Sequence, residues 1–66
     1  MIDIYYKGYV IKLKNSPYDT EWLAVVRDGQ NQMIASDWHE NKQQGKEWAK
    51  SIIEKQILSW EHHSFA

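Results

Sequence analysis

The chain has no cysteine among its 66 residues, and this absence limits how its fold can be stabilised. A chain this short buries only about 60% of the surface that its unfolded form exposes, so its core is small. Small domains compensate with disulfides, a metal, tight packing or self-association, and without cysteine neither disulfides nor thiolate metal sites can form. We therefore expect a single domain, 1–66, in which self-association is one of the remaining sources of stability.

The composition excludes several classes of protein. Hydrophobic residues make up 42% of the chain and aromatic residues 14%, which is too rich for a disordered segment. No apolar stretch approaches the roughly 18 residues that span a bilayer, so we expect no membrane crossing. The absence of cysteine fits a reducing compartment, and Asp3 lies where a secretion signal would need a basic start, so we expect a cytoplasmic protein.

Aromatic and β-branched residues predict a first strand over residues 4–14. From Tyr9 the residues alternate between two faces, one formed by Tyr9, Ile11 and Leu13 and the other by Val10, Lys12 and Lys14. Gly8 interrupts this strand, and a glycine there indicates a bulge or a tight bend, so that residues 4–7 pair differently from residues 9–14.

Two further strands are expected, over residues 21–27 and 32–37. A cluster of turn formers around Pro17 separates the first two strands. The second strand is apolar on both faces, which is typical of a central strand. Asp28 and Gly29 then predict a tight hairpin, because Asp-Gly supplies the positive φ values that short hairpin turns require.

A long C-terminal helix is expected over residues 42–60. Asn41 can cap its first turn, with Gln44 completing a capping box. Its apolar stripe consists of Gly45, Trp48, Ala49, Ile52, Ile53, Ile57 and Trp60. Gly45 either lets the helix approach the sheet closely or is a tolerated weak position. The expected fold class is therefore α+β, a three-stranded antiparallel sheet packed on one helix (β-β-β-α).

This fold leaves two surfaces without a partner. A helix of 19 residues is about 28 Å long and strands of six residues about 20 Å, so the helix overhangs the sheet. Leu58, Trp60 and Phe65 would form a partner-binding surface there, unless the tail folds back over a sheet edge. The other surface is the far face of the sheet, which would present Val10, Lys12, Lys14, either Trp22 or Leu23, and either Met33 or Ile34.

Polar residues offer little for chemistry. Asp37 and His39 would project together if the third strand extended that far, and His62 and His63 are adjacent, so either pair could hold a metal. Such residues are also common in connections and at chain ends. The chain has no phosphate loop, no nucleophile elbow and no cysteine nucleophile. We therefore predict no enzyme, no catalytic residue, no metal and no cofactor.

A nucleic-acid-binding module is the alternative hypothesis. Lys12, Lys14 and Arg27 could lie on one sheet face among aromatic residues, an arrangement that fits a major groove or stacked bases. However, eight basic and nine acidic residues give a net charge of −1, so any such role depends on a local patch. The same three residues also suit the solvated side of an amphipathic sheet.

Three resemblances accompany this interpretation. The runs Tyr6-Lys7-Gly8-Tyr9-Val10 and Trp22-Leu23-Ala24-Val25-Val26-Arg27-Asp28 resemble the first two strands of the AP2-type DNA-binding domain, in which a three-stranded sheet reads the major groove. The order of elements is similar to that of HicB-like antitoxin domains, which implies binding to a toxin protein. The whole chain also resembles short, stand-alone cyanobacterial proteins, which implies a bacterial source and no particular function.

The sequence therefore predicts a small non-catalytic protein-interaction module. Its partners would be a second copy of the chain, as a homo-oligomer, or another protein. Nucleic acid is the less favoured partner, and no membrane partner is expected.

Overall fold

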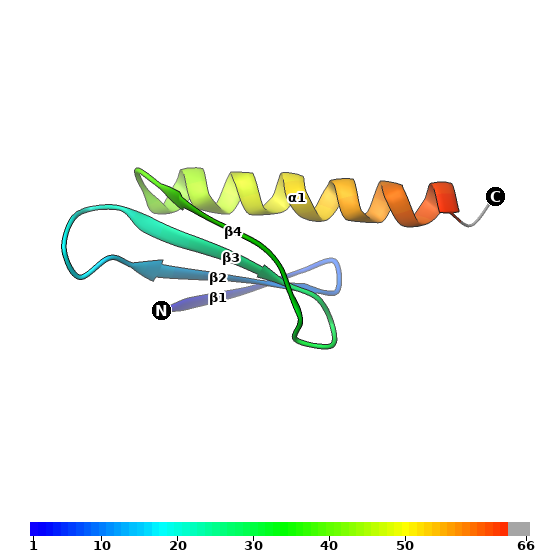
Figure 1. Ribbon diagram of the computed structural model, residues 1–66, viewed down its shortest axis with the longest axis horizontal. Helices are drawn as coiled ribbons and strands as arrows, with labels where there is room; N and C mark the ends of the chain where they lie inside the picture. The colour runs from blue at the N-terminus through cyan, green and yellow to red at the C-terminus, as the bar shows by residue number, and fades with distance from the viewer. Residues whose placement is uncertain (64–66) are drawn as a thin grey trace.

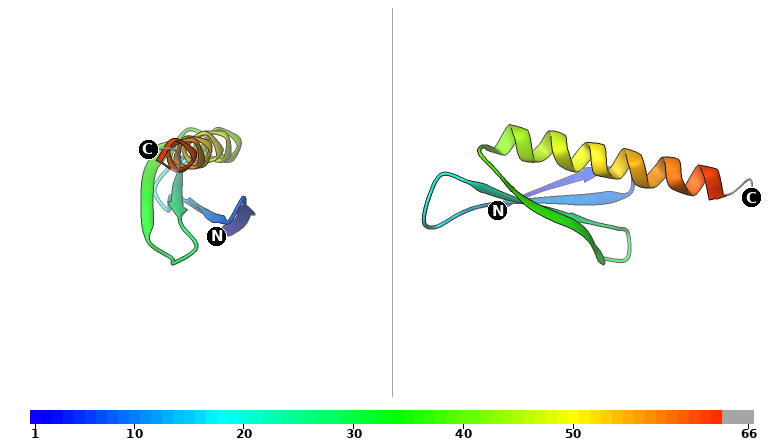
Figure 2. Two further views of the ribbon diagram at one scale, coloured as in Figure 1. Left: turned by 90° about the vertical axis from the view of Figure 1, so that its right-hand side faces the viewer. Right: turned by 45° about the horizontal axis from the view of Figure 1, so that its top comes forward.

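The structure is a computed structural model that describes residues 1–63, with side chains described for residues 1–59. The fold is α+β: four antiparallel strands form a meander in the order β1-β2-β3-β4, and one C-terminal helix packs on one face of this sheet (Figures 1 and 2). The elements are β1 (Ile2–Tyr6), β2 (Tyr9–Asn15), β3 (Trp22–Arg27), β4 (Met33–His39) and α1 (Lys42–His63). The predicted fold class is thus confirmed, with one strand more than expected.

The additional strand results from a turn at Lys7 and Gly8. Both residues have positive φ, 51° and 85°, and they join Tyr6 directly to its cross-strand partner Tyr9. Two consecutive positive φ values define the short hairpin turn whose twist matches that of paired strands. The prediction of one strand over 4–14 was therefore wrong, while the expected tight bend at Gly8 is confirmed. Lysine is not a typical turn former, so the sequence indicated the turn only through Gly8.

The hairpin between β3 and β4 also differs from the expected one. Positive φ falls on Asn31, at 65°, rather than on Gly29. Asp28 organises the loop: its backbone oxygen accepts the N–H of Asn31 at 3.0 Å, and its Oδ1 accepts the N–H groups of Gln30 and Gln32, each at 2.9 Å. This arrangement is the longer loop in which a turn is followed by one left-handed residue.

Two predictions about the remaining elements are confirmed. β3 is an interior strand, flanked by β2 and β4. Asn41 caps α1, because its Oδ1 accepts the N–H of Gln44 at 2.9 Å. β4 ends at His39 and α1 at His63, so both elements are longer than the ranges 32–37 and 42–60 expected for them.

The core lies between the sheet and α1. Its fully buried side chains are Ile11, Leu13, Ala24, Val26, Ala49 and Ile53. Gly45 faces this core: a Cβ built on it would lie 3.3 Å from Leu13 Cδ2 and 3.4 Å from Ala24 Cβ. The missing side chain therefore lets the first turns of α1 approach β2 and β3 closely.

The helix extends past the sheet. In Figure 1, α1 starts above the end of the sheet that carries the β2–β3 loop and continues beyond the two hairpin turns at the other end. Its 22 residues give a length of about 33 Å, compared with about 23 Å for a strand of seven residues. The predicted overhang is present.

Candidate interaction surfaces

The sheet has a second face that no described segment covers (Figure 2). We call it the open face. Because cross-strand partners share a face, the register places three rows of side chains on it. One row is Tyr5, Val10, Arg27 and Met33; the middle row is Asp3, Lys12, Val25 and Ser36; the last row is Lys14, Leu23 and Trp38. The sequence left open whether Trp22 or Leu23, and whether Met33 or Ile34, lies on this face. The register places Leu23 and Met33 there.

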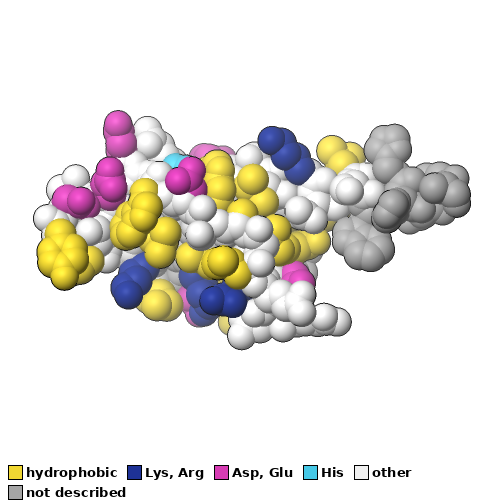
Figure 3. All heavy atoms as spheres, viewed as in Figure 1, with side chains coloured by type: hydrophobic (Ala, Val, Ile, Leu, Met, Phe, Trp, Pro, Cys, Tyr) yellow, Lys and Arg dark blue, Asp and Glu magenta, His cyan; other side chains and the backbone are white. Residues whose placement is uncertain are grey.

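Large apolar side chains occupy the corners of the open face. Tyr5 lies on edge strand β1 and is 79% exposed, whereas Met33 and Trp38 lie on the opposite edge strand, β4, and are 59% and 49% exposed. Met1 precedes β1 in the same alternation as Tyr5 and is 80% exposed. Figure 3 shows apolar side chains in groups over the sheet, with basic side chains beside them.

The three basic residues predicted to bind nucleic acid do share the open face. Two of them already have partners within the chain. Lys12 forms an ion pair with Asp3, its cross-strand neighbour, at 3.3 Å, and Arg27 Nη1 donates to the Asn31 backbone oxygen at 2.9 Å. Lys14 is exposed. The face is therefore mixed, with its basic residues on the two interior strands beside aliphatic ones and its most exposed large apolar residues at the corners.

The overhang of α1 is the second surface. Leu58 is 58% exposed, so a large apolar side chain faces solvent near the end of the described part of the helix. The other two residues predicted here, the Trp60 side chain and Phe65, lie outside the described residues. Sequence reasoning thus placed Leu58 correctly as an exposed apolar residue.

The two residues proposed for a metal on β4 lie in different surroundings. Asp37 is exposed, and its Oδ1 accepts the N–H of Trp38 at 2.9 Å. The His39 ring packs against Trp48 of α1 at a tilt of 46°, with 5.0 Å between the ring centroids, and its Nε2 is buried without a hydrogen-bond partner. Among the described residues, no group of three or more His, Cys, Asp or Glu side chains could hold a metal ion. The side chains of His62 and His63 lie outside the described part.

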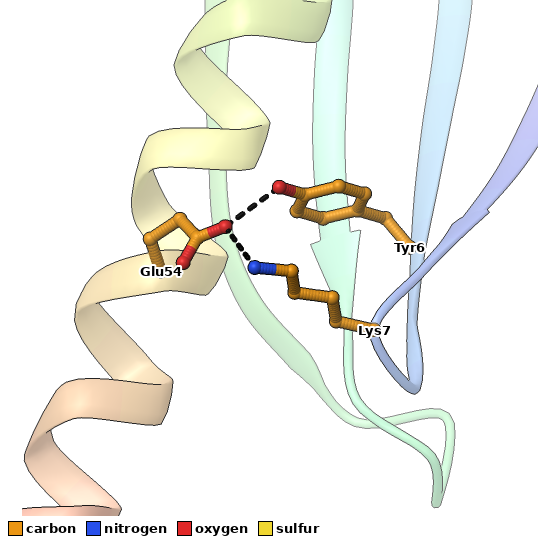
Figure 4. Close-up of polar contacts among 3 residues, drawn as sticks. All are labelled: Tyr6, Lys7 and Glu54. Atoms are coloured by element: carbon orange, nitrogen blue, oxygen red, sulfur yellow. Dashed lines mark hydrogen bonds and ion pairs between the residues drawn. The ribbon is translucent and has the colours of Figure 1, made fainter.

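A polar network that sequence reasoning missed joins the first hairpin to the helix (Figure 4). The Tyr6 hydroxyl and the Lys7 ammonium both donate to Glu54 Oε1, each at 2.6 Å. The hydrogen bond from Lys7, followed by that from Tyr6, holds the pKa of Glu54 below its ordinary value. The same contacts with Glu54 raise the pKa values of Tyr6 and Lys7. Both donors bind the same carboxylate oxygen, so the network attaches the first hairpin to α1.

A groove of about 430 Å³ adjoins one end of the open face. Trp38 forms one wall, and the β2–β3 loop supplies the remaining lining residues, Ser16, Pro17, Tyr18, Asp19 and Glu21. Tyr18 is 93% exposed, and none of the polar or charged side chains that the structure describes is buried. The groove therefore extends the end of the open face that carries Trp38.

No protein-family model, curated protein or solved structure matches this chain. The resemblances to AP2-type domains, HicB-like antitoxins and short cyanobacterial proteins therefore stay predictions. Over residues 1–63, α1 is not apolar enough along its length to span a bilayer.

Proposed function

We propose that this protein is a small, non-catalytic interaction module that self-associates through its open face. The observation that carries the proposal is the ring of exposed apolar side chains at the edges of that face, Tyr5, Met33 and Trp38 together with Met1. Exposed large apolar side chains gathered on one sheet face often mark a contact surface, because leaving them in water costs free energy.

The size of the exposed surface supports the same conclusion. The chain exposes 4863 Å², whereas a compact monomer of 7.9 kDa is expected to expose about 4,400 Å². A one-sided sheet and a projecting helix account for such an excess. Two open faces in contact would bury part of this surface, in the form of a two-layered sandwich flanked by helices.

A second copy of the chain fits the open face better than nucleic acid does. Of the basic residues there, Lys12 is partly neutralised by Asp3 and Arg27 is hydrogen-bonded to its own hairpin loop. A duplex would have to attract a chain of net charge −1 through so few cations. By contrast, apolar edge residues gain nothing from a phosphate backbone but gain from burial against a protein.

Sedimentation equilibrium from about 1 µM to about 1 mM tests the proposal, since interfaces of small area bind in this range. We expect the mass to rise from 7.9 kDa to twice that value. Met33→Glu should shift the transition to higher concentration, because it puts a charge into the contact. Leu58→Glu, a matched change of an exposed apolar residue on the overhang, should leave the transition unchanged.

Three outcomes would overturn this assignment. A strict monomer over the whole range contradicts self-association. Loss of association in Leu58→Glu but not in Met33→Glu would move the interface to the overhang. Salt-sensitive binding to duplex DNA or RNA, abolished by combined alanine substitution of Lys12, Lys14 and Arg27, would instead support the nucleic-acid alternative.

A further inference from the structure

We infer that two copies pack open face to open face with their strands aligned, so that β1 of one protomer lies over β4 of its partner. The inference rests on the self-association proposed above and specifies its geometry. It follows from which side chains the register places in each row and column of the face.

A symmetric pair of flat faces has two simple settings, because the twofold axis must lie in the plane of the contact. If the axis runs across the strands, each strand lies over its own copy. The middle row then faces itself, and Lys12 meets the partner subunit's Lys12. Like charges placed together in this way cost free energy in a contact from which water is excluded.

In the other setting the axis runs along the strands, between β2 and β3. Each row of one protomer then faces the same row of its partner, with the strands in the opposite order. β2 then lies over β3 of the partner, and β1 over β4. Lys12 meets the partner subunit's Val25, and Lys14 meets the partner subunit's Leu23. No basic residue of the middle or last row faces another, and each lysine side chain can lie along an aliphatic one with its charged end at the rim.

The corners of the face also complement one another in this setting. Tyr5 meets the partner subunit's Met33, and Met1 comes to the partner subunit's Trp38. Both contacts bring a methionine sulfur against an aromatic ring, which is a favourable pairing. The other setting would also pair methionine with an aromatic ring at each corner, so the middle row, with Lys12, is what distinguishes the two settings. Each occurs twice in the dimer, so four of the exposed large apolar side chains on each protomer are covered together. The strands of the two sheets are aligned in both settings, which is a common way for twisted sheets to pack.

Crosslinking distinguishes the two settings, and the absence of native cysteine makes it specific. Stacked sheets lie about 10 Å apart, beyond the reach of a disulfide, so the reagent is a short bismaleimide. Tyr5→Cys protein, labelled with nitrogen-15, is mixed with unlabelled Met33→Cys protein. We expect the mixed-mass dimer to be the main product. The matched mixture of Met33→Cys with Trp38→Cys, whose residues would meet only if the axis ran across the strands, should give little.

The two proposals fail separately. The unmodified chain could dimerise by mass while the Tyr5→Cys and Met33→Cys mixture gives no hybrid product. In that case the axis does not run along the strands, and self-association stands. If the chain stays monomeric, both fall. Because each cysteine could itself weaken the contact, Met33→Leu provides a second measurement. It keeps the apolar volume but removes both copies of the contact between the Met33 sulfur and the Tyr5 ring, and about a threefold to tenfold weaker dimer is expected. Unchanged affinity would contradict the pairing of Tyr5 with Met33.

Discussion

The Tyr6 hydroxyl donates to Glu54 Oε1 at 2.6 Å, and this bond joins the first hairpin of the chain to its C-terminal helix, 48 residues later. Lys7 donates to the same oxygen from the turn itself. The Tyr6 ring also lies under the ammonium of Lys50, at 5.3 Å from its centroid. The turn that separates β1 from β2 is therefore attached to α1 by polar contacts as well as by the core.

Glu54→Gln should weaken the acid dependence of stability. The bond from Lys7 lowers the pKa of Glu54 in the folded protein, so the stabilisation is complete above the ordinary value of 4.5 and is lost as pH falls through the lower, folded value. Urea unfolding at pH 7, 5, 4 and 3 should show a steeper loss below about pH 4.5 in the unmodified protein than in the variant. Glu47→Gln is the control, since Glu47 accepts only from Gln43 on the same helix. If the free energy of unfolding fell equally steeply with pH in Glu54→Gln and in the unmodified protein, the role of the network would be contradicted.

Gly45→Leu should destabilise the fold by about 1–3 kcal/mol, the usual cost of overpacking a core. Even a Cβ at this position lies 3.3 Å from Leu13 Cδ2, so a larger side chain must push α1 away from the sheet. Lys55→Leu, on an exposed position of the same helix, should change the free energy of unfolding much less. Chemical denaturation measures both, and similar values for the two variants would show that the close approach is not needed.

His39→Phe should raise the free energy of unfolding by about 1 kcal/mol. The change keeps a ring against Trp48 and removes Nε2, which is buried without a hydrogen-bond partner. Thermal unfolding with and without added zinc provides the second measurement, and zinc should leave the midpoint of the unmodified protein unchanged. A zinc-dependent rise that disappears in His39→Phe would instead support a metal site on β4.

Asn41→Ala should cost about 1 kcal/mol, the typical contribution of a helix N-cap. Its Oδ1 is the acceptor for the Gln44 N–H, which otherwise has no partner in the first turn of α1. Asn41→Ser keeps an acceptor at the same place, so its free energy of unfolding in urea should be close to that of the unmodified protein. A loss as large in the serine variant as in alanine would argue against capping.

The sequence predicted most strongly what depends on local pattern. The helix cap at Asn41, the interior position of β3 and the apolar stripe of α1 all follow from turn chemistry or periodicity, and the structure contains each of them, the stripe as far as Ile57. The turn at Lys7 was missed because lysine has little preference for positive φ and adopts it here only with Gly8 and strand pairing on either side.

The composition of the open face was only half predictable for the same reason. Val10, Lys12 and Lys14 follow from simple alternation, but Tyr5 requires the hairpin at Lys7, and Trp38 requires β4 to continue past 37. The contacts of Glu54 depend on residues 47 and 48 positions away. Helical periodicity leaves Glu54 outside the apolar stripe of α1 and could not show that the first turn reaches it.

The overhang of α1 would give the proposed dimer, with its axis along the strands, a defined valency. A twofold axis along the strands preserves their direction, so both helices project past the same end of the sandwich. With two stacked sheets between them, the helix axes lie roughly 30 Å apart. One target with two sites at that spacing would be held at both helix ends at once. Its apparent affinity could then exceed that of a single end by about two to four orders of magnitude.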